Sequence, residues 1–287
     1  MKSKLSPFLW SGTVMVLALA LTLYVATRGK LFFEENQIVS PDISLGPVTA
    51  YFFSVVVVMG LILFIIPLSK LRWILRAFFT LMFAWGVFIV IALILTPTAA
   101  YTVAAIAGIT WLLWDRIWLH DLLLLITISG AGAVFGFLFS PLTFMIFMLV
   151  IAVYDVVAVR FGFMVWMADK LSESATMPAF VFPKKVKDWR LRLKNIRVGD
   201  LKNEELDRRE YAILGGGDIG FPLMFTVSVF FASGLASAML VGAFALMGLM
   251  SAFLIQLLWL KGKPMPALPP IAFLSVIGFL ITCLFLS

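Results

Sequence analysis

Cysteine and histidine are almost absent from this chain: Cys283 and His120 are the only examples among 287 residues. A single cysteine cannot form an intramolecular disulfide bond and says nothing about the redox compartment. One cysteine and one histidine are too few for the usual structural zinc sites, and the two-histidine motif of zinc proteases does not occur. The sequence therefore predicts a protein that works without a metal or another cofactor.

Charged residues are also scarce, at 13% of the chain, whereas hydrophobic residues make up 63%. A soluble domain has roughly 45–50% apolar residues. The mean hydropathy of +1.09 indicates an integral, multi-pass membrane protein, which would lie in the plasma membrane if the source is prokaryotic. The apolar run in the first 27 residues is too long for the core of a cleaved signal peptide, so it is expected to be the first span.

Nine apolar segments approach the length that crosses a bilayer, which is about 20 residues for a helix. They cover residues 8–27, 47–69, 73–95, 98–114, 122–139, 142–163, 211–233, 236–260 and 267–286. The sequence therefore predicts an all-α polytopic membrane protein with nine transmembrane helices. Its parts are an N-terminal membrane part, 1–163, with six spans, a hydrophilic loop, 164–210, and a C-terminal membrane part, 211–287, with three spans.

The distribution of lysine and arginine orients these spans. Nineteen of the 22 basic residues fall on the side of the N-terminus and the long loop, and two fall on the other side. Because basic loops stay in the cytoplasm, the N-terminus is predicted to be cytoplasmic and the C-terminus extracellular. The net charge of +7 follows from these loops, so we do not expect a nucleic-acid partner. The lipid bilayer is the expected surrounding, and self-association stays open.

The predicted loop at 164–210 is rich in basic residues and has the composition of a solvated cytoplasmic segment. Its apolar stretch at 177–182 supports a second interpretation. In that case this part of the loop would lie against the spans and gate or regulate access to a site.

Two aspartates lie inside apolar, membrane-length segments: Asp155 in the sixth and Asp218 in the seventh. A carboxylate in hydrocarbon costs several kcal/mol, so such a residue indicates a functional site. Each acid lies seven or eight residues from the cytoplasmic end of its predicted span, or about 10–12 Å at the helical rise. Matched depth on consecutive antiparallel spans would allow the two carboxylates to face each other.

The residues beside the two acids are unusual as well. Gly215, Gly216 and Gly217 precede Asp218, and glycines remove side chains and allow another backbone to approach. A helix-packing motif is the alternative interpretation. Tyr154 precedes Asp155, but adjacent helix positions point about 100° apart, so its ring is not expected to contact that carboxylate.

A proline-rich stretch opens the last predicted span at Pro266-Ala267-Leu268. Proline in the first turn of a helix is common, and this alone would account for it. Alternatively, the stretch is a rigid, kinked segment whose backbone groups are free to meet a ligand. Composition leaves both interpretations open.

Three short motifs now stand in order on the sixth, seventh and ninth predicted spans: Tyr154-Asp155, Gly215-x-Gly217-Asp218 and Pro266-Ala267-Leu268. Together they resemble the signatures of the presenilin and signal peptide peptidase families, which are intramembrane aspartyl proteases of the GxGD type. Size and predicted orientation are most similar to compact archaeal presenilin homologues.

The resemblance implies an aspartic-type endopeptidase that cuts transmembrane segments of other membrane proteins. It implies catalytic roles for Asp155 and Asp218. Substrate-binding or site-shaping roles are implied for the residues around them: Tyr154, Gly215, Gly216, Gly217, Pro266, Ala267 and Leu268.

Such a pair of carboxyls would share one proton and activate water by general acid–base catalysis. A helical substrate hides its carbonyl groups in its own hydrogen bonds, so it must unwind before attack. We expect the segments around Gly215–Gly217 and Pro266–Leu268 to offer a backbone edge that pairs with the unwound substrate as a strand.

Two other functions use the same residues differently. A proton- or ion-coupled transporter or channel could relay protons through Asp155 and Asp218. A serine protease would need a serine–histidine pair, and His120 beside Asp121 is the only histidine from which to build one. The ordered set of three motifs favours the aspartyl protease over both.

Overall fold

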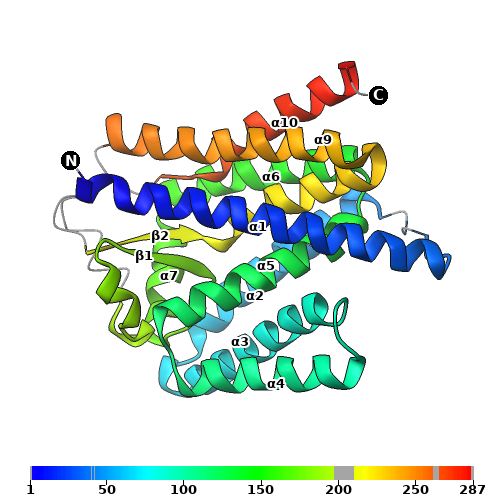
Figure 1. The fold of residues 1–287 in the computed structure, drawn as a ribbon. Coiled ribbons are helices and arrows are strands. Elements are labelled where there is room, and N and C mark those ends of the chain that lie inside the picture. The colour runs from blue at the N-terminus through cyan, green and yellow to red at the C-terminus, as the bar shows by residue number, and fades with distance from the viewer. Residues whose placement is uncertain (1, 40, 42, 197–209, 261–264, 286–287) are drawn as a thin grey trace.

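The structure, a computed structural model, describes residues 2–39, 41, 43–196, 210–260 and 265–285 and is dominated by helices (Figure 1). The helices are α1 (Lys2–Glu35), α2 (Leu45–Ile65), α3 (Leu68–Ile91), α4 (Pro97–Leu113), α5 (Ile117–Phe137), α6 (Pro141–Arg160), α7 (Phe163–Glu173), α9 (Gly216–Leu258) and α10 (Leu268–Phe285). Two strands, β1 (Ala179–Pro183) and β2 (Tyr211–Gly215), and two short 3₁₀ helices, η1 (Val186–Arg190) and η2 (Leu193–Asn195), complete the described fold.

Seven of these helices are long and apolar enough to cross a membrane, namely α1, α2, α3, α5, α6, α9 and α10. Helix α4 is apolar but has only 17 residues. Helix α9 has 43 residues and contains one non-helical position, Gly234, with φ 85°. Glycine tolerates this conformation because it lacks a Cβ atom. The chain turns back there into two arms (Figure 1), between the seventh and eighth predicted spans.

Two predicted helix boundaries near the acids are wrong. The seventh span was expected to begin at residue 211, but residues Tyr211–Gly215 form strand β2 and the helix begins at Gly216. The sixth span was expected to reach residue 163, but α6 ends at Arg160. Gly162 then adopts a left-handed conformation with φ 74° and directs the chain into the separate helix α7.

Strands β1 and β2 form a two-stranded antiparallel sheet in which Ala179 is opposite Gly215 and Pro183 is opposite Tyr211. The side chains of Phe180, Val181 and Phe182 are fully buried. Strand β1 contacts α5 and α1, so the apolar stretch at 177–182 lies against the membrane helices, as the second interpretation of the loop predicted. Residues 197–209 of that predicted loop lie outside the described residues.

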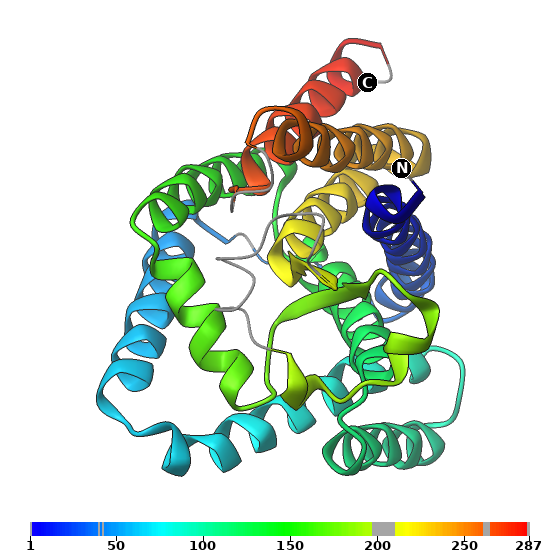
Figure 2. The ribbon, with the colours of Figure 1, turned by 90° about the vertical axis from the view of Figure 1, so that its left-hand side faces the viewer.

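The helices differ in how deeply they are packed. Helix α5 packs against α1, α3 and α9, and most of its length is buried. Helix α2 packs mainly on α6 and α7 and is the least buried of the seven long helices. Seen from the end that carries the strands (Figure 2), α2 lies on the rim and the sheet lies inside the ring of helices.

The beginning of α1 and the end of α10 lie at opposite ends of the bundle, and the strands and α7 lie at the same end as the beginning of α1 (Figure 1). The segments predicted to be cytoplasmic therefore gather at one end. The end of α6 and the beginning of α9, which carry the two acids, adjoin α7 and β2 in the chain and so lie at this same end.

Candidate active site

Asp155 lies on α6, five residues before the helix ends, and only 4% of it is exposed. Its Oδ2 atom accepts a hydrogen bond of 3.2 Å from the backbone N–H of Leu268. Leu268 is the first residue of α10, where the N–H groups have no partner within the helix. The positive end of the α10 dipole therefore faces a carboxylate from a helix more than one hundred residues away.

An apolar cluster fixes α6, α9 and α10 around this contact. Below Asp155 on α6, Ile151 and Ala152 pack with Phe225 of α9 and Leu268 of α10 in one buried group. Because the three helices share this cluster, it fixes the backbone of α6 at Asp155 relative to α9 and to the beginning of α10.

Asp218 is the third residue of α9, and Gly215 is the N-cap residue of that helix. The backbone N–H of Gly215 donates a hydrogen bond to the Asp218 carboxylate. An acidic side chain at the third helical position commonly reaches back to the N-cap in this way. Asp218 as a residue is partly exposed, and the first turn of its own helix orients its carboxylate.

The two carboxylates lie close enough for the charge of Asp155 to act on Asp218. They are brought together because α6 contacts both α9 and α10. Among the described residues, no group of three or more His, Cys, Asp or Glu side chains is arranged to hold a metal ion. Two acids near helix N-termini thus lie close together here, and a pair of carboxyls of this kind can transfer protons.

The glycines before Asp218 allow two backbone segments to touch. The N–H of Gly216 donates a 2.8 Å hydrogen bond to the carbonyl oxygen of Pro178, just before β1. A Cβ atom at Gly216 would lie 2.9 Å from that oxygen, which is too close for any side chain. At Gly217 an added Cβ would meet only the ring of Phe221. The middle glycine is therefore the one that the packing requires.

The remaining predicted site residues lie around the acids in different ways. Pro266 and Ala267 are partly buried and precede α10 in a non-helical conformation. The ring of Tyr154 packs edge-on against Phe53 of α2, with ring centroids 5.4 Å apart. Its hydroxyl is still within electrostatic range of Asp155. The tyrosine thus connects the site to α2.

Sequence reasoning missed two neighbours of the site, Pro178 and Asp121. Pro178 accepts the hydrogen bond from Gly216, and the carboxylate of Asp121 accepts one from Val181 of β1. Both contacts join segments that are far apart in the chain. The signal that could have found Asp121 was its place directly before the apolar segment 122–139, next to the only histidine of the sequence.

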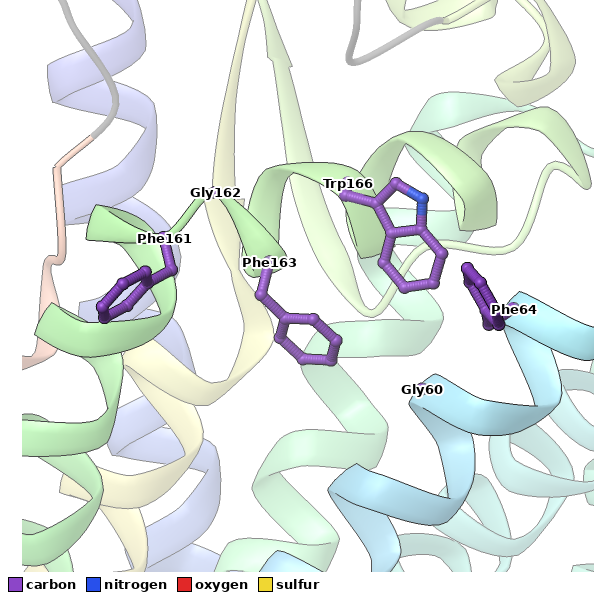
Figure 3. Close-up of a pocket in the computed structure, with 6 residues that line it drawn as sticks. All are labelled: Gly60, Phe64, Phe161, Gly162, Phe163 and Trp166. Carbon is purple, nitrogen blue, oxygen red and sulfur yellow. The ribbon is translucent and has the colours of Figure 1, made fainter.

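A cavity of about 420 Å³ lies between the end of α2 and the junction of α6 and α7 (Figure 3). Its lining is Gly60, Phe64, Phe161, Gly162, Phe163 and Trp166. In Figure 3 the rings of Phe163 and Trp166 extend towards α2, and Phe161 points away. The lining carries no acid, base or nucleophile, so this cavity suits apolar groups and not the chemical step.

Comparison with known proteins bears directly on this site. The family model described as "Signal-peptide peptidase, presenilin aspartyl protease" matches residues 12–287. A search of the curated proteins found no match. A presenilin family intramembrane aspartate protease solved in space group C222 superposes with a TM-score of 0.61 at 17% identity, covering 96% of each chain.

A second structure described in the same words, in space group P2, gives a TM-score of 0.57 at 18% identity and covers 97% of this chain and 98% of the other. At this identity the two structures show a shared fold, and the family match extends over almost the whole sequence. The chain belongs to the signal-peptide peptidase and presenilin family and is an intramembrane aspartyl protease.

Proposed function

We propose that Asp155 and Asp218 are the catalytic pair of this protease and that they hydrolyse peptide bonds within transmembrane segments of other membrane proteins. The observation that carries the proposal is the meeting of two acids from different helices, with Asp155 bound to the N–H of Leu268. All three motifs of the sequence contribute to this one place.

The mechanism follows from two neighbouring carboxyls that share a proton. The ionised carboxylate takes a proton from a water molecule, which attacks the scissile carbonyl carbon. The protonated acid donates to the carbonyl oxygen, and a proton then passes to the leaving amine. The mechanism requires a path for water to the pair, and Asp218 as a residue is partly exposed.

Strand β2 is the edge that we propose for the unwound substrate. The N–H of Gly216 donates to the carbonyl of Pro178, and the N–H of Lys184 donates to the carbonyl of Glu210. Between these two bonds, every second residue of each strand therefore turns its backbone N–H and C=O groups towards the other strand. In an antiparallel pair the alternate residues turn their N–H and C=O groups outward. The backbone N–H and C=O groups of Ile213 therefore point away from β1. Ile213 lies two residues before the glycines, and these groups can pair with an extended segment.

We further propose nine membrane crossings, with α4 as a short span and the two arms of α9 as separate spans. The N-terminus would lie in the cytoplasm, and the C-terminus would lie outside. The basic segments and the strands at one end of the bundle support this orientation (Figure 1). In a prokaryote the membrane would be the plasma membrane.

Access for a substrate helix is proposed between α2 and α6. Helix α2 is the least buried long helix, and the apolar cavity of Figure 3 opens beside it. Tyr154 packs on the same helix, so a displacement of α2 would also move the ring beside Asp155. The comparisons give no support to the alternative of a proton- or ion-coupled transporter.

The test is cleavage of a single-span substrate by the purified protein in detergent, with the products identified by mass spectrometry. Asp155→Asn and Asp218→Asn keep the size of each side chain and should each abolish cleavage. Asp188→Asn, in η1, removes an equivalent charge away from the site and should cleave at the same positions as the wild type. Cleavage that survives in either of the first two variants contradicts the proposal.

A further inference from the structure

Strand β1 has two edges, and only one of them pairs with β2. The hydrogen bonds from Gly216 to Pro178 and from Lys184 to Glu210 set the alternation along the strand. The N–H and C=O groups of Ala179 and Val181 consequently point away from β2. An unpaired edge of this kind is a template for any extended chain.

Two consecutive side chains of α5 occupy that second edge. The carboxylate of Asp121 accepts the N–H of Val181 with both oxygens, at 3.1 and 3.3 Å. The Nε2 atom of His120 lies 3.2 Å from the carbonyl oxygen of Ala179. His120 is completely buried, and 5% of Asp121 is exposed. One donor and one acceptor of the strand are therefore both satisfied by the same turn of helix.

A tryptophan fixes which nitrogen of His120 carries the proton. The Nε1–H of Trp111, on α4, points to Nδ1 of His120 at 3.3 Å. An indole nitrogen can only donate, so Nδ1 must be the acceptor and Nε2 must carry the hydrogen that is donated to Ala179. The guanidinium of Arg76 lies 5.9 Å from the Trp111 ring centroid. It also donates to the carbonyl of Leu112, which holds the end of α4.

We propose that His120 and Asp121 are positioning residues that close the outer edge of β1, so that a substrate strand can pair only with β2, beside Asp218. The inference rests on the proposed function. It adds an explanation of how the position of the cut in the substrate is selected. The same two residues hold β1 where Pro178 can bind Gly216, which places the first turn of α9. They act through the sheet and do not touch the reacting atoms.

Simple satisfaction of buried polar groups is the competing explanation, and α5 supplies a matched control for it. Ser129 is also fully buried on α5, and its hydroxyl donates to the carbonyl of Ala18 on α1 at 3.3 Å. Loss of that bond should lower stability without affecting β1. A role in positioning predicts that His120 and Asp121 differ from Ser129 in where the substrate is cut.

The experiment compares Asp121→Leu, His120→Leu and Ser129→Ala in the full-length protein with a single-span substrate. We expect kcat to fall about tenfold in the first two, because small displacements of catalytic groups are costly. We also expect new cuts two residues from the wild-type position, because a strand keeps its faces only when it slips by two. Asp121→Asn and His120→Gln, which keep an acceptor and a donor, should restore the wild-type cuts.

Amide hydrogen exchange at Val181 gives a second readout that needs no activity. Exchange there should accelerate in Asp121→Leu and remain slow in Ser129→Ala. If Asp121→Leu does not fold, Asp121→Ala removes the acceptor without adding bulk and replaces it. The inference is overturned if the Leu variants keep the wild-type cleavage positions, the wild-type kcat and the wild-type exchange rate at Val181. A wild type that cleaves nothing would instead overturn the proposed function, and exchange would still decide the role of Asp121.

Discussion

Asp155 and Asp218 reach the same site by opposite means. Asp218 is held locally, by Gly215 three residues earlier in the first turn of the same helix. Asp155 stands within α6 and is held by Leu268, which is 113 residues away and begins another helix. One acid therefore depends on the conformation of a short turn, and the other depends on how three helices pack. Variants that disturb only one of these supports should separate the two contributions.

Among variants that keep both acids, the largest effect is expected from Gly216→Ala, which disturbs the local support of Asp218. The added Cβ would meet a backbone oxygen at 2.9 Å, and backbone cannot be displaced cheaply. A displacement near 1 Å at a catalytic group can cost about 100-fold in rate, and we expect a loss of kcat/KM of that order.

Gly217→Ala is the matched control, because the added Cβ meets only a mobile ring. Its loss should be clearly smaller. Equal losses in the two glycine variants, measured as kcat/KM on one substrate, would show that flexibility of the turn matters and that the close contact does not.

A second prediction addresses the distant support of Asp155. Leu268→Pro removes the N–H that donates to the carboxylate, and proline is tolerated in the first turn of a helix. Leu268→Ala keeps the N–H and loses the same buried side chain. A hydrogen bond to a charged group contributes about 1.5–3 kcal/mol, so the proline variant should be slower than the alanine variant by at least about tenfold. Equal rates in the two Leu268 variants would show that the N–H at the beginning of α10 does not support Asp155.

A third, smaller effect is expected for Gly215→Ala. The added Cβ would lie 3.0 Å from Oδ2 of Asp218 itself, and a side chain can yield by a few tenths of an ångström. We expect roughly tenfold lower kcat with little change in KM, because the acid is displaced and the substrate edge of β2 is retained. A change confined to KM would place Gly215 in substrate binding and not in the support of the acid.

The smallest effect is expected for Tyr154→Phe. The ring packs on Phe53 and would be preserved, and only the hydroxyl near Asp155 is lost. Cleavage should fall by about threefold or less. It should fall further in Tyr154→Ala, which removes edge-on ring contacts with both Phe52 and Phe53, each worth about 0.5–1.5 kcal/mol. A larger loss in Tyr154→Phe than in Leu268→Pro would reverse the order proposed for the supports of Asp155.

The sequence predicted the features that depend on local composition. The apolar segments, the break at Gly234 and the two acids could be found because hydrophobicity and isolated charges are visible within a window of about 20 residues. The family signatures then predicted which acids belong together. The exact ends of the helices were predicted less accurately. The end of α6 was misplaced because Gly162 redirects the chain, although its apolar composition continues into α7.

The sequence predicted a substrate-pairing edge around Gly215–Gly217, but Gly216 and Gly217 begin α9 and the strand lies at Tyr211–Gly215. The position of strand β2 could not be predicted, for a different physical reason. Residues 211–215 are apolar and continuous with α9, so their composition fits a helix. Their strand conformation comes from pairing with β1, which begins 32 residues earlier in the chain, and from the short backbone contact at Gly216. The same limit applies to Asp121, whose partner Val181 is 60 residues away.

The position of the two acids near one end of the bundle has a consequence for the fate of the products. Asp155 lies five residues from the end of α6, about 7–8 Å along the axis, and Asp218 lies in the first turn of α9. On the proposed function, a cut at that depth would divide a 20-residue substrate helix unequally. One product keeps only a few apolar residues and can leave the bilayer, while the other retains most of the span and stays anchored. The depth of the acids would thus make the cleavage a release of one half and a retention of the other.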